Sequence, residues 1–363
     1  MRRSLCFLAA AAMVAMVGAC GGDSNSSPTV GPTTSAVVTN EAATSAPATT
    51  PLAPTSIVAA TSTTGVPLPV YPLTGLAVTD PVVAERPALV VKIDNNAAAR
   101  PQSGLNEADI VFEEIVEVQT RFAAVFQSQS ADPVGPIRSG RTQDVQLLGS
   151  FNSPLFMWSG GNANVTRAIE GSDFVNLSAQ RNTVYKTAGF YRSNQRSGPH
   201  DLYASTTGAW TLTPDGAGAP AQQFLYRTPG EPAVGEPASG VDLNMDGLPI
   251  EWRYDEPSGT YLRSNGGTPH MDELSGQVST ENVLIMFVDY QPSAADARSP
   301  EAQTIGTGEA WVFTGGELQR GTWTRNDRLS AIVLHDASGA TMALTPGRTF
   351  VELARAGSAK ATP

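Results

Sequence analysis

The chain has 363 residues, of which 41% are hydrophobic, and its formal net charge at pH 7 is −11. This acidic excess excludes the broad basic surface that nucleic-acid binding or attachment to anionic lipid head groups requires. We therefore expect no nucleic-acid partner, and we expect any bound anion to be held locally by a few placed arginines.

The first 19 residues have the pattern of a secretory signal peptide. Arg2 and Arg3 precede a short apolar run at 5–17, which is too short to span a membrane. The small residues Gly18 and Ala19 stand directly before Cys20. This arrangement is similar to a bacterial lipobox, which implies cleavage before Cys20 and attachment of a palmitate-type acyl chain to its sulfur.

The cysteine count favours acylation over an ordinary signal peptide with an incidental cysteine. The only other cysteine, Cys6, would be removed with the signal peptide, so no disulfide could form. Residues 20–68 are rich in Thr, Ser, Pro and Ala, which predicts a disordered tether. We therefore expect a protein held by its lipid on the extracytoplasmic face of the cell membrane, with its folded part among the polymers of the envelope.

The first folded segment, 69–227, has the pattern of an α/β domain. Compact apolar runs bounded by turn residues predict strands, and apolar residues at helical spacing predict helices. The expected strands are 88–93, 109–116, 121–126 and 154–158, of which the second and third are close enough to form a hairpin, and the expected helices cover 142–151 and 165–169. The last strand and helix are joined by the glycine loop Ser159–Asn162, which predicts free backbone N–H groups for an anion.

The second folded segment predicts a smaller domain of mostly antiparallel strands. A Pro- and Gly-rich linker at 228–240 separates the two segments, the β-rich domain covers 241–355, and we expect a flexible tail at 356–363. Gly-rich turns separate short apolar runs. The expected strands are 249–254, 260–264, 282–289, 309–313, 321–325, 330–334 and 349–353.

Several short stretches together resemble the YerB-like lipoproteins of Gram-positive bacteria. These stretches are Leu73-Thr-Gly75, Arg100-Pro-Gln-Ser-Gly-Leu105, Ala108-Asp-Ile-Val-Phe-Glu113, Thr120-Arg-Phe122, Val125-Phe-Gln-Ser128, Gly135-Pro-Ile-Arg-Ser139, Pro199-His-Asp-Leu-Tyr203, Tyr261-Leu-Arg263, His270 with Asp272, Gly306 to Gly308 and Gly321-Thr-Trp323. The resemblance covers roughly residues 70–355. It implies two modules, both domains of unknown function, and it brings no established activity.

The chain departs from the family pattern at two places. Val118-Gln119 stands where the family usually has Gly-Gly, so we expect a different hairpin turn there. Asp201 follows His200 where the family usually has Asn, which puts a direct role for that amide in doubt.

Polar residues at turns and element ends suggest a binding site for an anion. Arg100, Arg138, Arg141, Ser159 and His200 all fall at such positions, where functional groups usually lie. The planar guanidinium of arginine suits carboxylate and phosphate groups. We therefore favour a non-catalytic binding or accessory module that recognises an anionic wall component or a wall-synthesis partner. The alternative for the two turn arginines is structural, with Arg138 and Arg141 paired to Asp144 or Glu114.

A second hypothesis is an envelope hydrolase or transferase. His200 would act as a base, with Asp201 beside it and Ser159 as the nucleophile. Neighbouring residues of a strand point to opposite faces, however, so His200 and Asp201 are not expected to orient each other. The sequence also lacks the recognised hydrolase and zinc motifs, which favours binding over catalysis and argues against zinc.

One segment is similar to the start of a calcium loop. Asp242, Asn244 and Asp246 precede a glycine, as in the first half of that loop, but Arg253 stands where the closing Glu should be. We therefore favour a polar turn over a calcium site and expect no cofactor.

Overall fold

The computed structural model describes residues 69–363. The predicted signal peptide, the lipidated Cys20 and the tether lie outside these residues, so those three expectations stay predictions. Along the described part of the chain, no helix is sufficiently long and apolar to cross a bilayer.

The first module is a mixture of strands and short helices, as predicted. The sequence indicated the strands at 88–93, 109–116, 121–126 and 154–158 and the helix at 165–169 to within a few residues, whereas the helix predicted at 142–151 is divided into α2 and η2. The elements are α1 Pro81–Glu85, β1 Leu89–Asp94, η1 Ala97–Ala99, β2 Ile110–Val116, β3 Gln119–Phe126, α2 Gln143–Leu147, η2 Gly149–Phe151, β4 Leu155–Trp158, α3 Ala163–Glu170, β5 Val175–Ser178, α4 Asn182–Thr187, β6 Tyr191–Arg192, β7 Leu202–Tyr203 and α5 Thr206–Trp210.

The second module consists of strands, most of them antiparallel, which confirms the predicted fold class. Its strands are β8 Glu236–Pro237, β9 Gly240–Met245, β10 Leu248–Asp255, β11 Thr260–Asn265, β12 Thr268–Pro269, β13 Met271–Asp272, β14 Gly276–Gln277, β15 Ser279–Thr280, β16 Asn282–Phe287, β17 Tyr290–Pro292, β18 Pro300–Ala302, β19 Gly306–Thr314, β20 Glu317–Arg325, β21 Val333–Asp336, β22 Thr349–Ala354 and β23 Ala359–Thr362.

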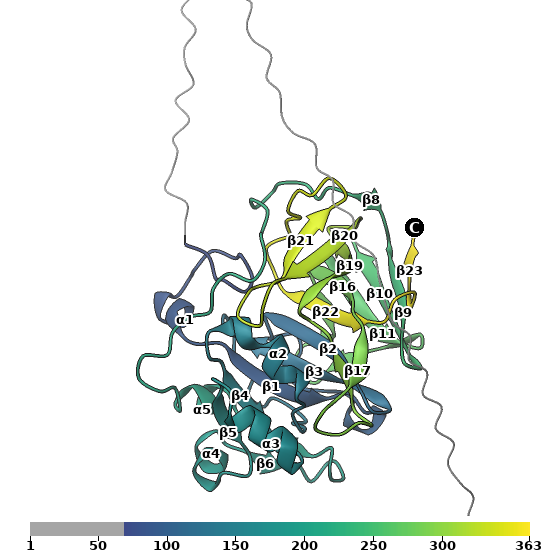
Figure 1. Ribbon diagram of the computed structural model, residues 1–363. Helices are drawn as coiled ribbons and strands as arrows, with labels where there is room; N and C mark the ends of the chain where they lie inside the picture. The colour runs from purple at the N-terminus through teal and green to yellow at the C-terminus, as the bar shows by residue number, and fades with distance from the viewer. Residues whose placement is uncertain (1–68) are drawn as a thin grey trace, which may run out of the picture. The chain divides into compact units, whose positions relative to one another are not determined.

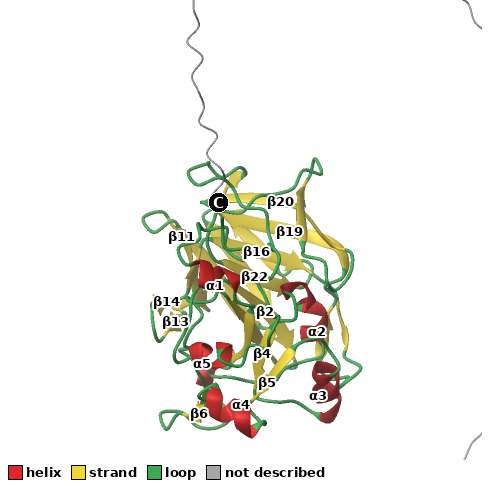
Figure 2. Cartoon of the chain, turned by 90° about the vertical axis from the view of Figure 1, so that its left-hand side faces the viewer, coloured by secondary structure: helices red, strands yellow, loops and turns green. Residues whose placement is uncertain are grey.

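One large sheet runs through both modules (Figure 1). Its strand order is β21-β20-β19-β16-β22-β2-β3-β1-β4-β5, with β8 beside β20. The junction is the parallel pairing of β2 with β22, in which Glu113 lies opposite Glu352. A second sheet, β12-β11-β10-β9-β23 with β15 beside β11, belongs to the second module alone. Helices α3, α4 and α5 gather around the β4–β5 end of the large sheet (Figure 2).

Apolar side chains cover both faces of the large sheet. Alternation along a strand sends neighbouring residues to opposite faces, so Leu89, Val91 and Ile93 belong to one core and Val90 to the other. The first core is closed by the second sheet, including Trp252. Lys92, Asp94 and Arg121 occupy the second face, where charged groups are buried among apolar neighbours.

Two predictions for the second module need correction. The segment Asp242–Met245, expected to be a turn or ion loop, belongs to strand β9, and only Asp246 and Gly247 form the turn to β10. Both turn residues have positive φ, 50° and 95°, as a two-residue hairpin of this kind requires. The tail expected to be flexible contains β23, which pairs with β9 and covers an edge that would otherwise expose unpaired backbone groups.

Candidate functional site

The candidate site lies where β1 and β4 end. These strands are parallel neighbours, so their carboxyl ends meet at one edge of the sheet, which is where open α/β sheets usually bind ligands. Asp94 ends β1, and Ser159–Gly161 follow β4. The turn Arg138–Arg141 packs between them, because Arg138 N donates to Lys92 O and Ser159 N donates to Arg138 O.

Asp94 anchors two of the predicted site residues. Its buried Oδ2 lies 2.6 Å from His200 Nδ1 and 3.0 Å from Arg138 Nε, while Oδ1 accepts a hydrogen bond from Asn96 N. His200 and Arg138 keep 18% and 21% of their side-chain surfaces exposed. The carboxylate therefore fixes an imidazole and a guanidinium that both reach the surface.

Arg141 is held by the tip of the β2–β3 hairpin. Its Nε and Nη2 donate to Glu117 Oε1 and Oε2 at 3.1 and 2.8 Å, a bidentate pair, and Nη1 donates to Gly140 O. Partial burial raises the pKa of Glu117, but the hydrogen bonds and charge of Arg141, together with Ser299 and Arg121, outweigh burial and lower this pKa overall. The turn of the β2–β3 hairpin therefore supplies the carboxylate that holds Arg141 in place.

Arg121 is the residue that the sequence analysis missed as a part of this site. Its side chain is buried, and Nη1 donates to Ser139 O at 2.8 Å. Within residues 69–363 no carboxylate oxygen lies within 4.0 Å of its guanidinium, and Nε has no hydrogen-bond partner. Burial, and then repulsion from Arg141 and Arg138, lowers the pKa of Arg121 to about 10. The signal available in the sequence was a charged residue at the start of the otherwise apolar predicted strand 121–126.

The structural partners predicted for Arg138 and Arg141 were wrong. Glu114 and Asp144 both form ion pairs with the buried Lys92, at 2.5 and 2.7 Å from Nζ. Asp144 contacts Arg141 only through the backbone, accepting from Arg141 N at 2.6 Å. Burial and the neighbouring Asp144 raise the pKa of Glu114 to about 7. Arg138 and Arg141 thus pair with Asp94 and Glu117, and Lys92 is the centre of a separate cluster with Glu114 and Asp144.

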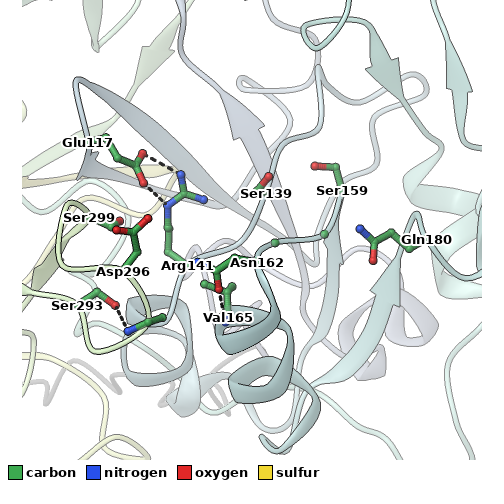
Figure 3. Close-up of a pocket in the computed structure, with 13 residues that line it drawn as sticks. Glu117, Ser139, Arg141, Ser159, Asn162, Val165, Gln180, Ser293, Asp296 and Ser299 are labelled. Carbon is green, nitrogen blue, oxygen red and sulfur yellow. Dashed lines mark hydrogen bonds and ion pairs between the residues drawn. The ribbon is translucent and has the colours of Figure 1, made fainter. Parts of the chain in front are cut away.

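A pocket of about 350 Å³ opens beside this arginine group (Figure 3). In Figure 3, Arg141 and its partner Glu117 lie at one end and Gln180 at the other, with Ser139 and Ser159 between them. We call it the arginine pocket, and its lining residues are Glu117, Ser139, Arg141, Ser159, Gly160, Gly161, Asn162, Val165, Gln180, Ser293, Ala295, Asp296 and Ser299.

The glycine loop shapes the pocket, and its last residue caps the helix that follows. Asn162 caps α3, and its Oδ1 accepts from the backbone N–H groups of Asn164 and Val165. Gly160 has φ +112°, and a Cβ there would lie 2.2 Å from the Nε2 of Gln180. Position 160 therefore requires glycine, because φ is positive there and Gln180 approaches closely.

The predicted site residues do not all come together. Arg141 and Ser159 line the arginine pocket. His200 and Arg138 both contact Asp94 and are not among the residues that line this pocket. Asp201 pairs with Arg192 at 2.5 Å, and among residues 69–363 no hydrogen bond joins it to His200. The two residues were not expected to orient each other, but both precede β7, so strand alternation is not the reason. Arg100 lines a different pocket, with His270.

The oxygens of the calcium candidate already have protein partners. Asp242 forms an ion pair with Arg253, and Asp246 contacts Arg355 at 2.8 and 3.0 Å. Asn244 Oδ1 accepts from Gly247 N at 2.7 Å inside the hairpin turn. Within residues 69–363, no group of three His, Cys, Asp or Glu side chains is arranged to hold a metal ion.

Comparison with known proteins places the chain in a family. The model of the DUF3048 N-terminal domain, described as a protein of unknown function, matches residues 73–217, and the model of the DUF3048 C-terminal domain matches 241–351. The chain is 29% identical over 293 residues to the Bacillus subtilis protein named "Putative lipoprotein YerB", covering 78% of this chain and 85% of that protein.

A solved structure agrees with these matches. The crystal structure of YerB protein from Bacillus subtilis superposes with a TM-score of 0.70 at 26% sequence identity, and covers 81% of this chain and 99% of that one. The structure therefore shares both its modules and their arrangement along the chain with a protein named as a lipoprotein. The chain belongs to the DUF3048 family, whose two domains of unknown function are joined here by one continuous sheet.

Proposed function

We propose that this protein is a lipid-anchored, extracytoplasmic accessory module that binds an anionic component of the cell envelope in the arginine pocket. The observation that carries the proposal is Arg121, a buried guanidinium without a carboxylate partner among the described residues, directly behind Ser139. A buried charge is costly unless it is paired. An anion in the adjoining pocket, which Glu117 and Asp296 also line, would give this guanidinium an ionic partner.

The pocket also has the means to orient such an anion. Arg141 is already fixed by Glu117, so little side-chain entropy is lost when its remaining N–H donors bind a ligand. The hydroxyl groups of Ser139, Ser159 and Ser293 line the same space and can donate to phosphate or carboxylate oxygens. The relationship to a lipoprotein and the predicted acylation of Cys20 favour a ligand that is part of the envelope.

Retention on purified wall polymer tests this proposal. Wild-type protein, the Arg138→Ala/Arg141→Ala variant and the control Arg181→Ala would be sedimented with wall carrying phosphate polymers and with wall stripped of them. Arg181 is a suitable control because it is half exposed and, among residues 69–363, its one ion pair is with Glu170 at 3.5 Å. We expect retention that depends on the phosphate polymer, decreases with salt, and is lost only in the double variant. Equal retention of a folded double variant would refute the proposal.

The His200–Asp94 pair supports catalysis as the second candidate function. A buried carboxylate on Nδ1 orients an imidazole so that Nε2 can accept a proton, and within residues 69–363 no protein group hydrogen-bonds to His200 Nε2. No serine or threonine hydroxyl of these residues hydrogen-bonds to the ring, however. Incubating wall polymer with wild type and His200→Asn separates the two candidates, since a product that disappears in the variant favours a hydrolase.

A further inference from the structure

A second pocket, of about 380 Å³, lies at the boundary between the two modules. Residues 97–101 of the first module form one side, and residues 265–271 of the second form the other. It shares no lining residue with the arginine pocket. We call it the boundary pocket, and its lining residues are Ala97, Arg100, Pro101, Asn265, Thr268, Pro269, His270 and Met271.

Arg100 supplies the positive charge of the boundary pocket. Its Nε and Nη2 donate to the side chain and the backbone carbonyl of Asn95, both at 3.1 Å. These two bonds fix the plane of the guanidinium, and in the described part of the chain neither N–H group of Nη1 has a hydrogen-bond partner. Among residues 69–363, no carboxylate lies within ion-pair distance of Arg100.

His270, which lines the boundary pocket, belongs to a closed ring of buried hydrogen bonds. Glu113 accepts from Arg263 Nη2 at 2.6 Å and from Asn95 Nδ2 at 3.0 Å. Arg263 also contacts Nδ1 of His270, whose Nε2 lies 2.6 Å from Gln102 Oε1. Gln102 Nε2 donates to Asn95 Oδ1 at 3.3 Å and so closes the ring. Four of these residues, Gln102, Glu113, Arg263 and His270, belong to the stretches that carry the family resemblance, so stretches from both modules meet in this ring.

The hydrogen-bond directions determine the charge of the ring. Arginine only donates, so His270 Nδ1 accepts, and the ring proton is on Nε2, where it is donated to Gln102. Burial, with Arg263 and Arg100 nearby, lowers the pKa of His270 well below its usual value, so the imidazole is neutral. Burial and the adjacent Glu113 raise the pKa of Glu352 well above its usual value. The guanidinium of Arg263 is thus paired with Glu113, whereas Arg100 has no ion pair among residues 69–363.

The walls of the boundary pocket indicate what kind of anion fits. Ala97, Pro101, Pro269 and Met271 present apolar surface, which suits a ligand with an apolar body and not a free inorganic ion. Asn265, whose Oδ1 accepts from Arg263 Nη1 at 2.8 Å, and Thr268 add hydrogen-bonding groups to the same lining. A planar guanidinium matches a carboxylate in geometry. A carboxylate, a neighbouring amide and a small apolar side chain occur together at the end of a peptide.

We propose that the boundary pocket binds the carboxyl terminus of a peptide that ends in a small apolar residue, with Arg100 binding the carboxylate. The apolar walls take the last side chain, and Asn265 and Thr268 are placed to bind the last peptide group. This site is independent of the arginine pocket, and either can exist without the other. A ligand that contacts both walls would also connect residues 97–101 of the first module with 265–271 of the second.

Calorimetric titration of the full-length protein with N-acetyl-alanyl-alanine, and with the same peptide as its C-terminal amide, tests the proposal. We expect the acid to bind roughly tenfold or more tightly than the amide, since a hydrogen-bonded charge pair is lost with the amide. Arg100→Gln should weaken binding of the acid by a similar factor. Arg181→Gln, at an exposed arginine, should have no effect.

A second variant keeps the test decisive if Arg100→Gln fails to fold. Met271 is 44% exposed, so Met271→Glu should fold and should repel the carboxylate, weakening the acid more than the amide. Arg138→Ala/Arg141→Ala should bind the peptide as wild type does, which separates this site from the arginine pocket. Equal binding of acid and amide, no binding of either, or wild-type binding by folded Arg100→Gln or Met271→Glu would overturn the proposal.

Discussion

Replacing Arg121 with methionine tests whether the arginine pocket contains an uncompensated charge. The pKa of Arg121 is lowered from 12.5 to about 10, chiefly by burial. At 1.36 kcal/mol per pKa unit, this shift corresponds to about 3 kcal/mol by which folding disfavours the charged form. Methionine removes that penalty but also the hydrogen bond to Ser139 O, which as a charged bond contributes roughly 2 kcal/mol. The two effects nearly cancel.

Arg263→Met is the matched comparison, because both arginines are almost fully buried. Arg263 is paired with Glu113 at 2.6 Å, so its removal would leave a buried carboxylate without its cation. Such a loss costs about 3 to 5 kcal/mol. We therefore expect the free energy of unfolding to change by no more than about 1 to 2 kcal/mol in Arg121→Met and to fall by several kcal/mol in Arg263→Met.

Equilibrium urea unfolding measures both changes, provided that tryptophan fluorescence and circular dichroism give coincident transitions. Arg121→Met should in addition lose phosphate-dependent retention on wall polymer while it remains folded. If Arg121→Met is destabilised as strongly as Arg263→Met, then Arg121 serves the fold and the argument from its missing partner fails.

Three further predictions concern charges elsewhere in the described residues. Lys92→Met should lower the free energy of unfolding by about 3 to 5 kcal/mol, because Glu114 and Asp144 would lose their buried cation. Urea titration measures this change, and a loss below about 1 kcal/mol would contradict the prediction. The pKa of Glu114 is raised from 4.5 to about 7, so between these pH values the folded state holds a proton that the unfolded state has released. The stability contributed by Glu114 should therefore fall as the pH rises from about 4.5 to 7. Comparing Glu114→Gln with wild type at pH 5 and 7.5 isolates the effect, and an equal decline in both would exclude it. The melting temperature should be the same in millimolar calcium and in excess chelator, because Asp242 and Asp246 already form ion pairs with arginines. A higher melting temperature in calcium would show a calcium site.

Much of the large sheet could be predicted from the sequence because its strands are compact apolar runs. β1 and β16 are buried along their whole lengths, which gives the strongest pattern that a strand can have. In β9, Val241, Leu243 and Met245 alternate with exposed residues, which is a strand pattern. Its polar residues have the spacing of a calcium loop, and this spacing led to the prediction of a turn instead. β23 has only two alanines to contact the core, which is too weak a signal to distinguish a strand from a tail.

The candidate site could be located from the sequence only in part. The turn at Arg138–Arg141 and the loop at Ser159–Asn162 were recognised because arginines and glycines at element ends are visible in a single sequence. Their partners, Asp94 and Glu117, come from other elements, and the sequence contains no signal for such tertiary pairing. The joining of the modules by β2 and β22 is also invisible, because parallel pairing links residues that are far apart along the chain.

The most direct test of the arginine pocket is to observe its guanidinium groups while an anion is added. We would record the side-chain Nε–H resonances of arginines in the ¹⁵N-labelled protein during titration with inorganic phosphate, assigning Arg121, Arg141 and the control Arg181 by substitution. Saturable shifts of the Arg121 and Arg141 resonances at one common phosphate concentration, with Arg181 unchanged, are what the proposed site predicts. If phosphate moves no arginine resonance, or moves all three in parallel without saturation, the arginine pocket is not an anion-binding site.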